Sequence, residues 1–140
     1  MGMDTDQATL WRAVLEAIGY DYIGITDIYK KGGVSLEEIT ITEGGSKSNL
    51  WNQIKADMLN TKTKTFKKSG GAVMMNVLTV AYALGDIKNL KEVIKNNLEI
   101  NKNYLPQKEK TDYYRKIFET RKMLLNSEMK EVFKILEKVK

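Results

Sequence analysis

The sequence predicts an α/β fold in which a short parallel sheet is surrounded by many helices. Two segments favour strands, because residues 39–42 are β-branched throughout and residues 61–66 alternate in character. Helical patterns precede, separate and follow these segments, and strands joined by helical crossovers run parallel. The 140 residues, 42% hydrophobic and 29% charged, are typical of one globular domain. We therefore expect a single ordered unit with a helix-rich C-terminus.

The first helix is expected to begin at Thr5 or Asp6, since either side chain can cap it. Apolar residues then recur at the helical period, namely Leu10, Val14, Ile18, Tyr22, Ile25 and Ile28/Tyr29. Two lysines followed by two glycines, at 30–33, predict its end. The strand at 39–42 follows, and residues 43–46 predict a tight turn.

A second helix is expected to begin at Ser48 or Asn49 and to present one apolar side, made of Leu50, Trp51, Ile54, Met58 and Leu59. After the strand at 61–66, residues 69–71 interrupt the chain. Residues 72–84 predict an almost uncharged helix, which we expect to be largely buried. A short amphipathic helix is expected at 89–98.

The C-terminal part is predicted to be a loop and one long helix. Residues 101–110 contain the single proline, Pro106, and are expected to form the loop. Thr111 or Asp112 would cap a helix that continues to near Val139. Its inner side would consist of Tyr114, Ile117, Phe118, Leu125, Met129, Val132, Phe133 and Leu136.

Two strands under five helices leave a sheet edge without a partner. Unpaired backbone groups are costly when buried and promote association when exposed. We therefore expect the chain to dimerise through this edge or to rearrange it.

Cysteine and histidine are both absent, which excludes disulfides, thiol nucleophiles, imidazole bases and the usual zinc sites. No apolar run approaches the roughly 18–20 residues of a membrane span, and the N-terminus lacks a signal-peptide pattern. We expect a soluble, cytoplasmic protein with no membrane partner and no metal site.

The net charge of +5 is unevenly distributed, with −4 over residues 1–60, +4 over 61–100 and +5 over 101–140. A basic C-terminal half can meet phosphate, nucleic acid or an acidic partner. The aromatic residues among these bases have helical spacing, which favours core packing over base stacking. Solvated lysines that keep a surface helix soluble are the favoured explanation, ahead of a nucleic-acid partner.

The turn after the first predicted strand is the strongest candidate for a ligand site. A strand, two glycines and a helix start follow one another within residues 39–51. Glycines let a ligand approach the backbone, and a helix N-terminus offers free N–H groups and partial positive charge. Taken alone the pattern is common, so it indicates a site only weakly.

Residues 43–59 read EGGSKSNLWNQIKADML and closely resemble GGGAKSxxWxQIxADVLG, the adenosine-binding signature of the FGGY carbohydrate kinases. The similarity extends colinearly over most of the chain. Residues 10–18 resemble the preceding family helix, 34–42 its strand, 69–84 its buried helix, 86–93 the helix after that, and 113–118 its tyrosine-rich terminal helix.

The resemblance implies part of an actin-like (ribonuclease H-like) ATPase lobe. Residues 1–100 would form a partial nucleotide-binding lobe, and residues 101–140 a helical extension packed on the same domain. ATP, with Mg²⁺ in the complete enzyme, would be the cofactor for phosphoryl transfer to a xylulose-, ribulose- or gluconate-type sugar. The sugar-binding lobe and its catalytic aspartate have no counterpart here, so the chain alone is expected to be inactive.

The residues carried over by the resemblance are those of the turn. Gly44, Gly45 and Ser46 match the wall against adenosine, Lys47 matches a common and solvated family residue, and Ser48 matches the motif serine, whose alternative role is to cap the helix. Trp51 is expected in the core, with Gln53 and Asp57 as local polar contacts. Departures from the pattern are Glu43 in place of a glycine, and Met74 and Met75 in place of small residues.

Three functions follow from these observations. The chain is expected to be a nucleotide-binding fragment or subunit of a sugar kinase, with a sugar-binding lobe or a second copy as partner. A non-catalytic nucleotide-binding or oligomerisation module derived from such a kinase is the alternative. A basic helical nucleic-acid binder is the third, and no base-reading cluster supports it.

Overall fold

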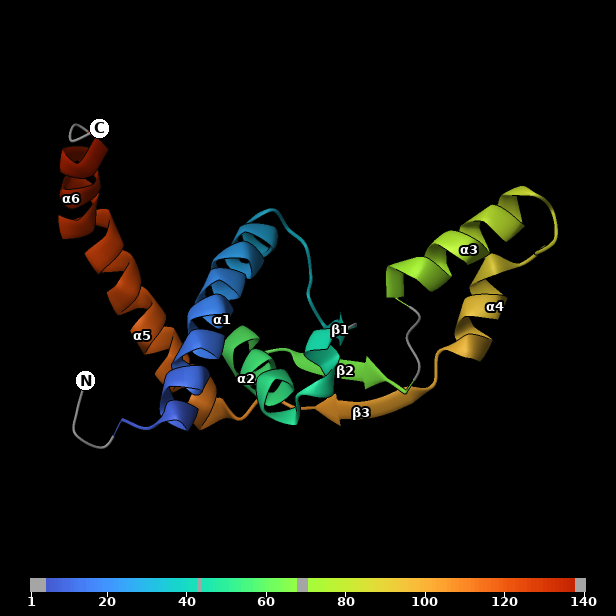
Figure 1. Cartoon of the computed structure of the whole chain (residues 1–140), viewed down its shortest axis with the longest axis horizontal. Coiled ribbons are helices and arrows are strands. Elements are labelled where there is room, and N and C mark those ends of the chain that lie inside the picture. The colour runs from blue at the N-terminus through green and yellow to red at the C-terminus, as the bar shows by residue number, and fades with distance from the viewer. Residues whose placement is uncertain (1–4, 43, 68–70, 138–140) are drawn as a thin grey trace.

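The computed structural model describes residues 5–42, 44–67 and 71–137, and Figure 1 shows their arrangement. The elements in chain order are α1 (Gln7–Lys31), β1 (Glu38–Ile41), the 3-10 turn η1 (Gly44–Lys47), α2 (Asn49–Leu59), β2 (Lys62–Phe66), α3 (Gly71–Ala83), α4 (Leu90–Asn97), β3 (Ile100–Tyr104), α5 (Lys108–Asn126) and α6 (Glu128–Glu137). None of the described helices is both long and apolar enough to cross a membrane.

The sheet has three strands in the order β1-β2-β3 and is mixed. β1 and β2 are parallel, as predicted, with Ile39 opposite Thr63. β3 pairs antiparallel with β2 and places Tyr104 opposite Thr63. The prediction of a loop at 101–110 is therefore wrong over residues 101–104, and also over 108–110, which begin α5. β3 is polar and only Tyr104 is buried in it, so pairing with β2 rather than a hydrophobic pattern determines its conformation.

α2 lies between α1, α5 and the sheet and supplies the centre of the core. Its residues Ile54 and Met58 are 2% and 5% exposed. Leu15, Tyr20 and Ile23 of α1 and Tyr114 and Phe118 of α5 pack around them. The rings of Tyr20 and Tyr114 meet edge to face, with centroids 6.4 Å apart.

Polar contacts fasten α5 to α1. The Tyr114 hydroxyl donates to Glu16 Oε1 at 2.8 Å and accepts from the Arg12 guanidinium at 3.0 Å. Further along, Arg115 makes a bidentate ion pair with Asp27, with N–O distances of 2.8 and 3.0 Å. Arg121 lies 3.3 Å from Asp21 Oδ1, so contacts at four residues of α1 hold α5 against it.

The apolar stripe predicted for α1 is exposed. Its members, hereafter the α1 stripe, are 40–71% exposed: Leu10, Val14, Ile18, Tyr22, Ile25, Ile28 and Tyr29. The buried side of the helix carries Leu15, Gly19, Tyr20 and Ile23 instead. α1 is apolar on two sides, and the described chain covers only the side that meets α2 and α5. Periodicity detects the apolar positions but not which of them have a partner.

α3 is also exposed, which contradicts its predicted burial. It contains no buried residue. Val73 and Val77 of α3, and Leu84 immediately after it, are 62–75% exposed. α3 packs on α4, and the two form an arm that projects beyond the end of the sheet (Figure 1). An uncharged composition predicts burial, but no described element buries this helix.

The long C-terminal helix is divided in two. α5 begins at Lys108 rather than after Thr111 or Asp112, and Ser127 separates it from α6. The Thr111 hydroxyl donates instead to the Asp57 carbonyl at 2.7 Å. Of the predicted inner side, Tyr114 and Phe118 are buried and Ile117 packs against them. The rest is half-buried or exposed, including Leu125, Val132, Phe133 and Leu136, because α5 continues past the core (Figure 1).

Gly19 marks the closest approach of α1 to α2. A Cβ at this position would lie 2.2 Å from the sulfur of Met58. We predict that Gly19→Val lowers the free energy of unfolding by about 1–3 kcal/mol, because the two helices must separate. Urea denaturation measures this loss. Gly24→Ala is the matched control, since its new Cβ meets Phe118 only at 4.0 Å. The control should be neutral or slightly stabilising, and equal losses in the two variants would contradict the prediction.

Candidate functional site

The turn between β1 and α2 is a short 3-10 segment that leads directly into a capped helix. β1 ends at Ile41, η1 covers Gly44–Lys47, and Ser48 is the N-cap of α2. The Ser48 side chain accepts a hydrogen bond from the Trp51 N–H at 3.2 Å. The Ser48 carbonyl accepts from the Asn52 N–H at 3.0 Å. The predicted capping role of Ser48 is therefore confirmed.

Both glycines of the turn are exposed, and packing within the chain requires neither of them. A Cβ on Gly44 would meet no heavy atom within 4 Å. On Gly45 the nearest atom would be Lys55 Nζ at 3.7 Å, an ordinary contact. Neither residue has a positive φ. The missing side chains leave the backbone of the turn open to a molecule approaching from outside.

Asn52 of α2 anchors the turn to the helix that follows it. This residue is fully buried, and its Nδ2 donates to the Ser46 carbonyl at 2.7 Å and to the Tyr104 hydroxyl at 3.3 Å. The Tyr104 hydroxyl in turn donates to Asn49 Oδ1 at 2.7 Å. The turn is thus connected to both α2 and β3.

The sequence prediction did not include Asn52 or Tyr104 among the site residues. Asn52 follows Ser48 by four residues, so helical spacing alone places it one turn into α2, beneath the cap. Tyr104 had no such signal, because its segment lacks a strand pattern.

The remaining predicted residues lie largely where expected. Lys47 is exposed and Ser46 is half-buried. Trp51 is 8% exposed and belongs to the core, as predicted. Gln53 donates to Asp57 Oδ1 and to the Leu105 carbonyl, both at 2.9 Å, which confirms its local polar role. Asp57 also accepts from the Gln107 N–H at 2.8 Å.

The sequence departs from the family pattern at Glu43 in the turn and at Met74 and Met75 further along the chain. Glu43 lies outside the described residues. Met74 is half-buried and Met75 is 40% exposed, and both belong to α3 in the projecting arm.

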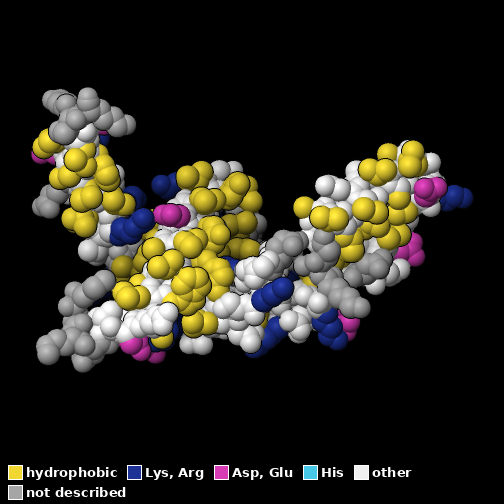
Figure 2. All heavy atoms as spheres, viewed as in Figure 1, with side chains coloured by type: hydrophobic (Ala, Val, Ile, Leu, Met, Phe, Trp, Pro, Cys, Tyr) yellow, Lys and Arg dark blue, Asp and Glu magenta, His cyan; other side chains and the backbone are white. Residues whose placement is uncertain are grey.

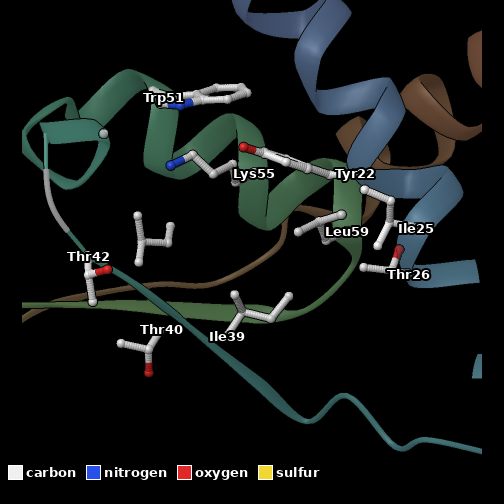
Figure 3. Close-up of a pocket in the computed structure, with 11 residues that line it drawn as sticks. Tyr22, Ile25, Thr26, Ile39, Thr40, Thr42, Trp51, Lys55 and Leu59 are labelled. Carbon is white, nitrogen blue, oxygen red and sulfur yellow. The ribbon is translucent and has the colours of Figure 1, made fainter. Parts of the chain in front are cut away.

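A cavity of about 470 Å³ adjoins the turn and opens between α1, β1 and α2 (Figure 3). Its lining residues are Tyr22, Ile25, Thr26, Ile39, Thr40, Ile41, Thr42, Gly45, Trp51, Lys55 and Leu59. The rings of Tyr22 and Trp51 stack against each other on one side of it, with centroids 6.2 Å apart (Figure 3). Most of the lining is apolar.

Lys55 is the charged group of this cavity. It is only 7% exposed, and its ammonium lies 4.8 Å from the centre of the Trp51 ring and 3.5 Å from Asn52 Oδ1. None of the ion pairs found among the described residues involves it. Burial lowers the pKa of the Lys55 ammonium to about 8, because the charged form loses its hydration.

No metal site is evident in the part of the chain that the structure describes, since no three acidic side chains gather there.

Comparison with known sequences finds carbohydrate and glycerol kinases. Residues 1–84 match the sequence model of the FGGY family of carbohydrate kinases, C-terminal domain. Over 112 residues the chain is 30% identical to the xylulose kinase of Staphylococcus epidermidis, and over 113 residues it is 27% identical to glycerol kinase 2 of Saccharolobus solfataricus. These alignments cover 80% of this chain but only 23% and 22% of the relatives.

Comparison with solved structures also finds kinases of which this chain covers about a quarter. The xylulose kinase from Rhodospirillum rubrum superposes with a TM-score of 0.74 at 20% identity, covering 91% of this chain and 26% of that one. For ligand-bound xylulose kinase from Lactobacillus acidophilus the TM-score is 0.72 at 25% identity, covering 93% and 27%. The fold is therefore part of an actin-like ATPase lobe, as predicted, although its small sheet is mixed rather than parallel.

Asn52 provides a test of how the turn is held. We predict that Asn52→Leu lowers the free energy of unfolding by about 1–3 kcal/mol, since the buried hydrogen bonds of the amide are lost. Amide hydrogen exchange of residues 44–48 should become faster. Tyr104→Phe, which keeps the Asn52–Ser46 bond, should leave that exchange unchanged. Faster exchange in the control alone would contradict this account.

Lys55 makes stability depend on pH. Its pKa is lower in the folded than in the unfolded chain, so the folded state gains stability as pH rises from about 8 to the usual lysine pKa. We predict that Lys55→Met raises the free energy of unfolding by about 1–3 kcal/mol at pH 7. The gain should shrink by pH 10 in urea denaturation. The exposed Lys47→Met should show no such trend, and a gain for Lys55→Met that is equal at both pH values would refute the assignment.

Proposed function

Because the chain belongs to the FGGY family of carbohydrate kinases, we propose that it is the nucleotide-binding part of an ATP-dependent kinase for a xylulose-type sugar. The observation that carries the proposal is the open glycine turn: Gly44 and Gly45 lack side chains although the protein leaves room for them. The turn also occupies the place of the adenosine-binding signature. A backbone surface that lacks side chains and is held by a hydrogen bond from buried Asn52 suits a flat, uncharged group such as adenosine.

In this proposal the turn acts through its backbone. Gly44, Gly45 and Ser46 form the wall against which adenosine lies, and the Asn52 hydrogen bond to the Ser46 carbonyl keeps that wall in position. Lys47, exposed at the end of η1, and Ser48, the cap of α2, border it. The N-terminus of α2 adds partial positive charge beside the polar groups of the nucleotide.

Catalysis would require more than this chain. Phosphoryl transfer needs positioned phosphates, a metal ion, and an oriented acceptor hydroxyl with its base. The chain spans about a quarter of the relatives it matches. The described residues offer no acidic cluster for Mg²⁺, so we assign none of its ligands here. We propose that a sugar-binding lobe supplies these groups, and that the 140 residues alone transfer no phosphate.

The proposed division of the chain keeps residues 1–100 as the partial nucleotide-binding lobe and residues 101–140 as its extension, although the extension begins with β3, a strand of the lobe's own sheet, before it continues as α5 and α6. Packing of Tyr114 and Phe118 against α1 and α2 supports the attachment of the extension. A cytoplasmic location is part of the same proposal, since ATP is abundant there.

A non-catalytic module that binds nucleotide or associates through its sheet edge is the second candidate. The observation that favours it is the free edge of β1, which is available for pairing. Nucleic-acid binding has less support, because Lys62 and Lys64 of β2 are engaged by Glu38 of β1.

Calorimetric titration of ATP–Mg²⁺ into the purified chain tests the nucleotide site. We predict saturable binding that Gly45→Val weakens about tenfold or more, because the new isopropyl group occupies the space proposed for adenosine. The variant should still fold, since a Cβ at Gly45 makes only ordinary contacts.

Gly24→Ala, whose new Cβ meets only Phe118 at 4.0 Å, is the control and should bind as the wild type does. Absence of binding at millimolar nucleotide by a folded chain would contradict the proposal. The turn would then be retained only as an element of the fold.

A further inference from the structure

Lys55 is a buried cation with no carboxylate partner among the described residues. It is only 7% exposed, and none of the ion pairs found there includes it. Its ammonium has the Asn52 amide oxygen at 3.5 Å and the centre of the Trp51 ring at 4.8 Å. With a pKa lowered by burial to about 8, the group is mostly charged at pH 7. Since an opposite charge best replaces the hydration that a buried charge loses, this position favours an anion.

Two hydrogen-bond donors meet at the space that Gly45 leaves open. A Cβ on Gly45 would lie 3.7 Å from Lys55 Nζ and 3.8 Å from the indole nitrogen of Trp51, Nε1. Within the described chain this indole N–H donates to no acceptor, since the contacts of Trp51 are its backbone hydrogen bond, the Tyr22 ring and the Lys55 ammonium. An oxygen atom that enters beside Gly45 can therefore approach both donors, one of which is charged.

The rest of the cavity is apolar and has the size of a small-molecule site. Its volume is about 470 Å³, and it forms a groove along α1 that is bounded on its other sides by β1 and α2 (Figure 3). Sites for small molecules measure roughly 300–1,000 Å³. Ile25 of α1 and Ile39 and Ile41 of β1 line the groove. Hydrophobic side chains also gather over α1 on the face shown in Figure 2. A ligand that fits must be apolar apart from its anionic group.

The charged and apolar parts of the cavity lie at different ends. Figure 3 shows the nitrogen of Lys55 below the Trp51 ring, on the side of the turn, whereas Tyr22, Ile25 and Ile39 lie toward the other end. The Tyr22 ring is stacked on that of Trp51, at an interplanar angle of 28°. This separation matches a molecule with an acid group at one end and a ring at the other.

We propose that the cavity binds a small aromatic monocarboxylate, whose carboxylate accepts hydrogen bonds from Lys55 Nζ and Trp51 Nε1 and whose ring lies against Tyr22 and the isoleucines. The two oxygens of a carboxylate can accept from both donors at once. This site goes beyond the proposed function and does not depend on it, although the cavity and the proposed adenosine wall share Gly45.

A nucleotide phosphate chain matches the cavity less well than a monocarboxylate does. Phosphates carry several charges, which proteins neutralise with several cations or a metal ion. Lys55 is the only charged side chain among the described residues that line the cavity. The apolar walls would also strip water from the phosphates without replacing its hydrogen bonds. One cation in an apolar space selects a single negative charge.

Trp51 fluorescence measures binding at this site. The chain has two tryptophans, Trp11 and Trp51, and Trp11 is 62% exposed. In a Trp11→Phe chain all tryptophan emission therefore comes from the wall of the cavity. Phenylacetate and the uncharged phenylacetamide, which has nearly the same shape, are titrated into this chain. We expect saturable changes in emission and an affinity about tenfold or more higher for phenylacetate, because only the acid gives the ammonium a charged acceptor.

Lys55→Met in the same chain should bring the two affinities within about twofold of each other. The matched control is Lys122→Met, which removes an exposed lysine of α5 outside the cavity and should keep the preference for the acid. Circular dichroism verifies that both variants fold. Equal affinities for acid and amide in the Trp11→Phe chain, a preference that survives Lys55→Met, or emission of the folded chain that does not saturate would each overturn the proposal. Titration with ATP–Mg²⁺ tests the proposed function separately, and neither result decides the other.

Discussion

The near-complete burial of α2 is the constraint on which the structure depends. Eight of its eleven residues are buried, and three of these, Asn52, Lys55 and Asp57, are polar. A buried polar group must find partners inside the protein. Asn52 finds them in the turn and β3, and Asp57 finds them in Gln53 and the start of α5. One helix therefore fixes the position of segments that are distant in the sequence.

This arrangement explains how an exposed turn can be a defined surface. Glycines at its tip would give the backbone freedom if nothing else held it. Ser48 caps the helix from the turn, and Asn52 binds the Ser46 carbonyl from the helix. The bare backbone of Gly44 and Gly45 is thus presented by a support that belongs to the core. Preorganisation of this kind reduces the cost of binding.

Local chemistry made part of the fold predictable. The caps at Asp6 and Ser48 follow from residues within a few positions of each other. The parallel pairing of β1 with β2 follows from the helix α2 that connects them. β3 was not predictable, because its pairing with β2 depends on contacts across about forty residues of chain. The Asn52–Tyr104 contact was missed for the same reason.

The α1 stripe and α3 show a different limit. Their apolar patterns were identified correctly, but no described part of the chain covers them. A pattern of apolar residues predicts that a surface needs a partner and says nothing about where the partner lies. The chain spans about a quarter of the length of the relatives that it matches.

The most direct measurement of the central claim is an amide NMR spectrum of the chain, recorded during titration with ATP–Mg²⁺. The account predicts that the shifted resonances belong to residues 44–48 and the first turn of α2, and that they move as one saturable set. Shifts confined to the groove along α1, or to the lysines of β2, would contradict the assignment of this turn as the nucleotide surface, and so would an unchanged spectrum of the folded chain.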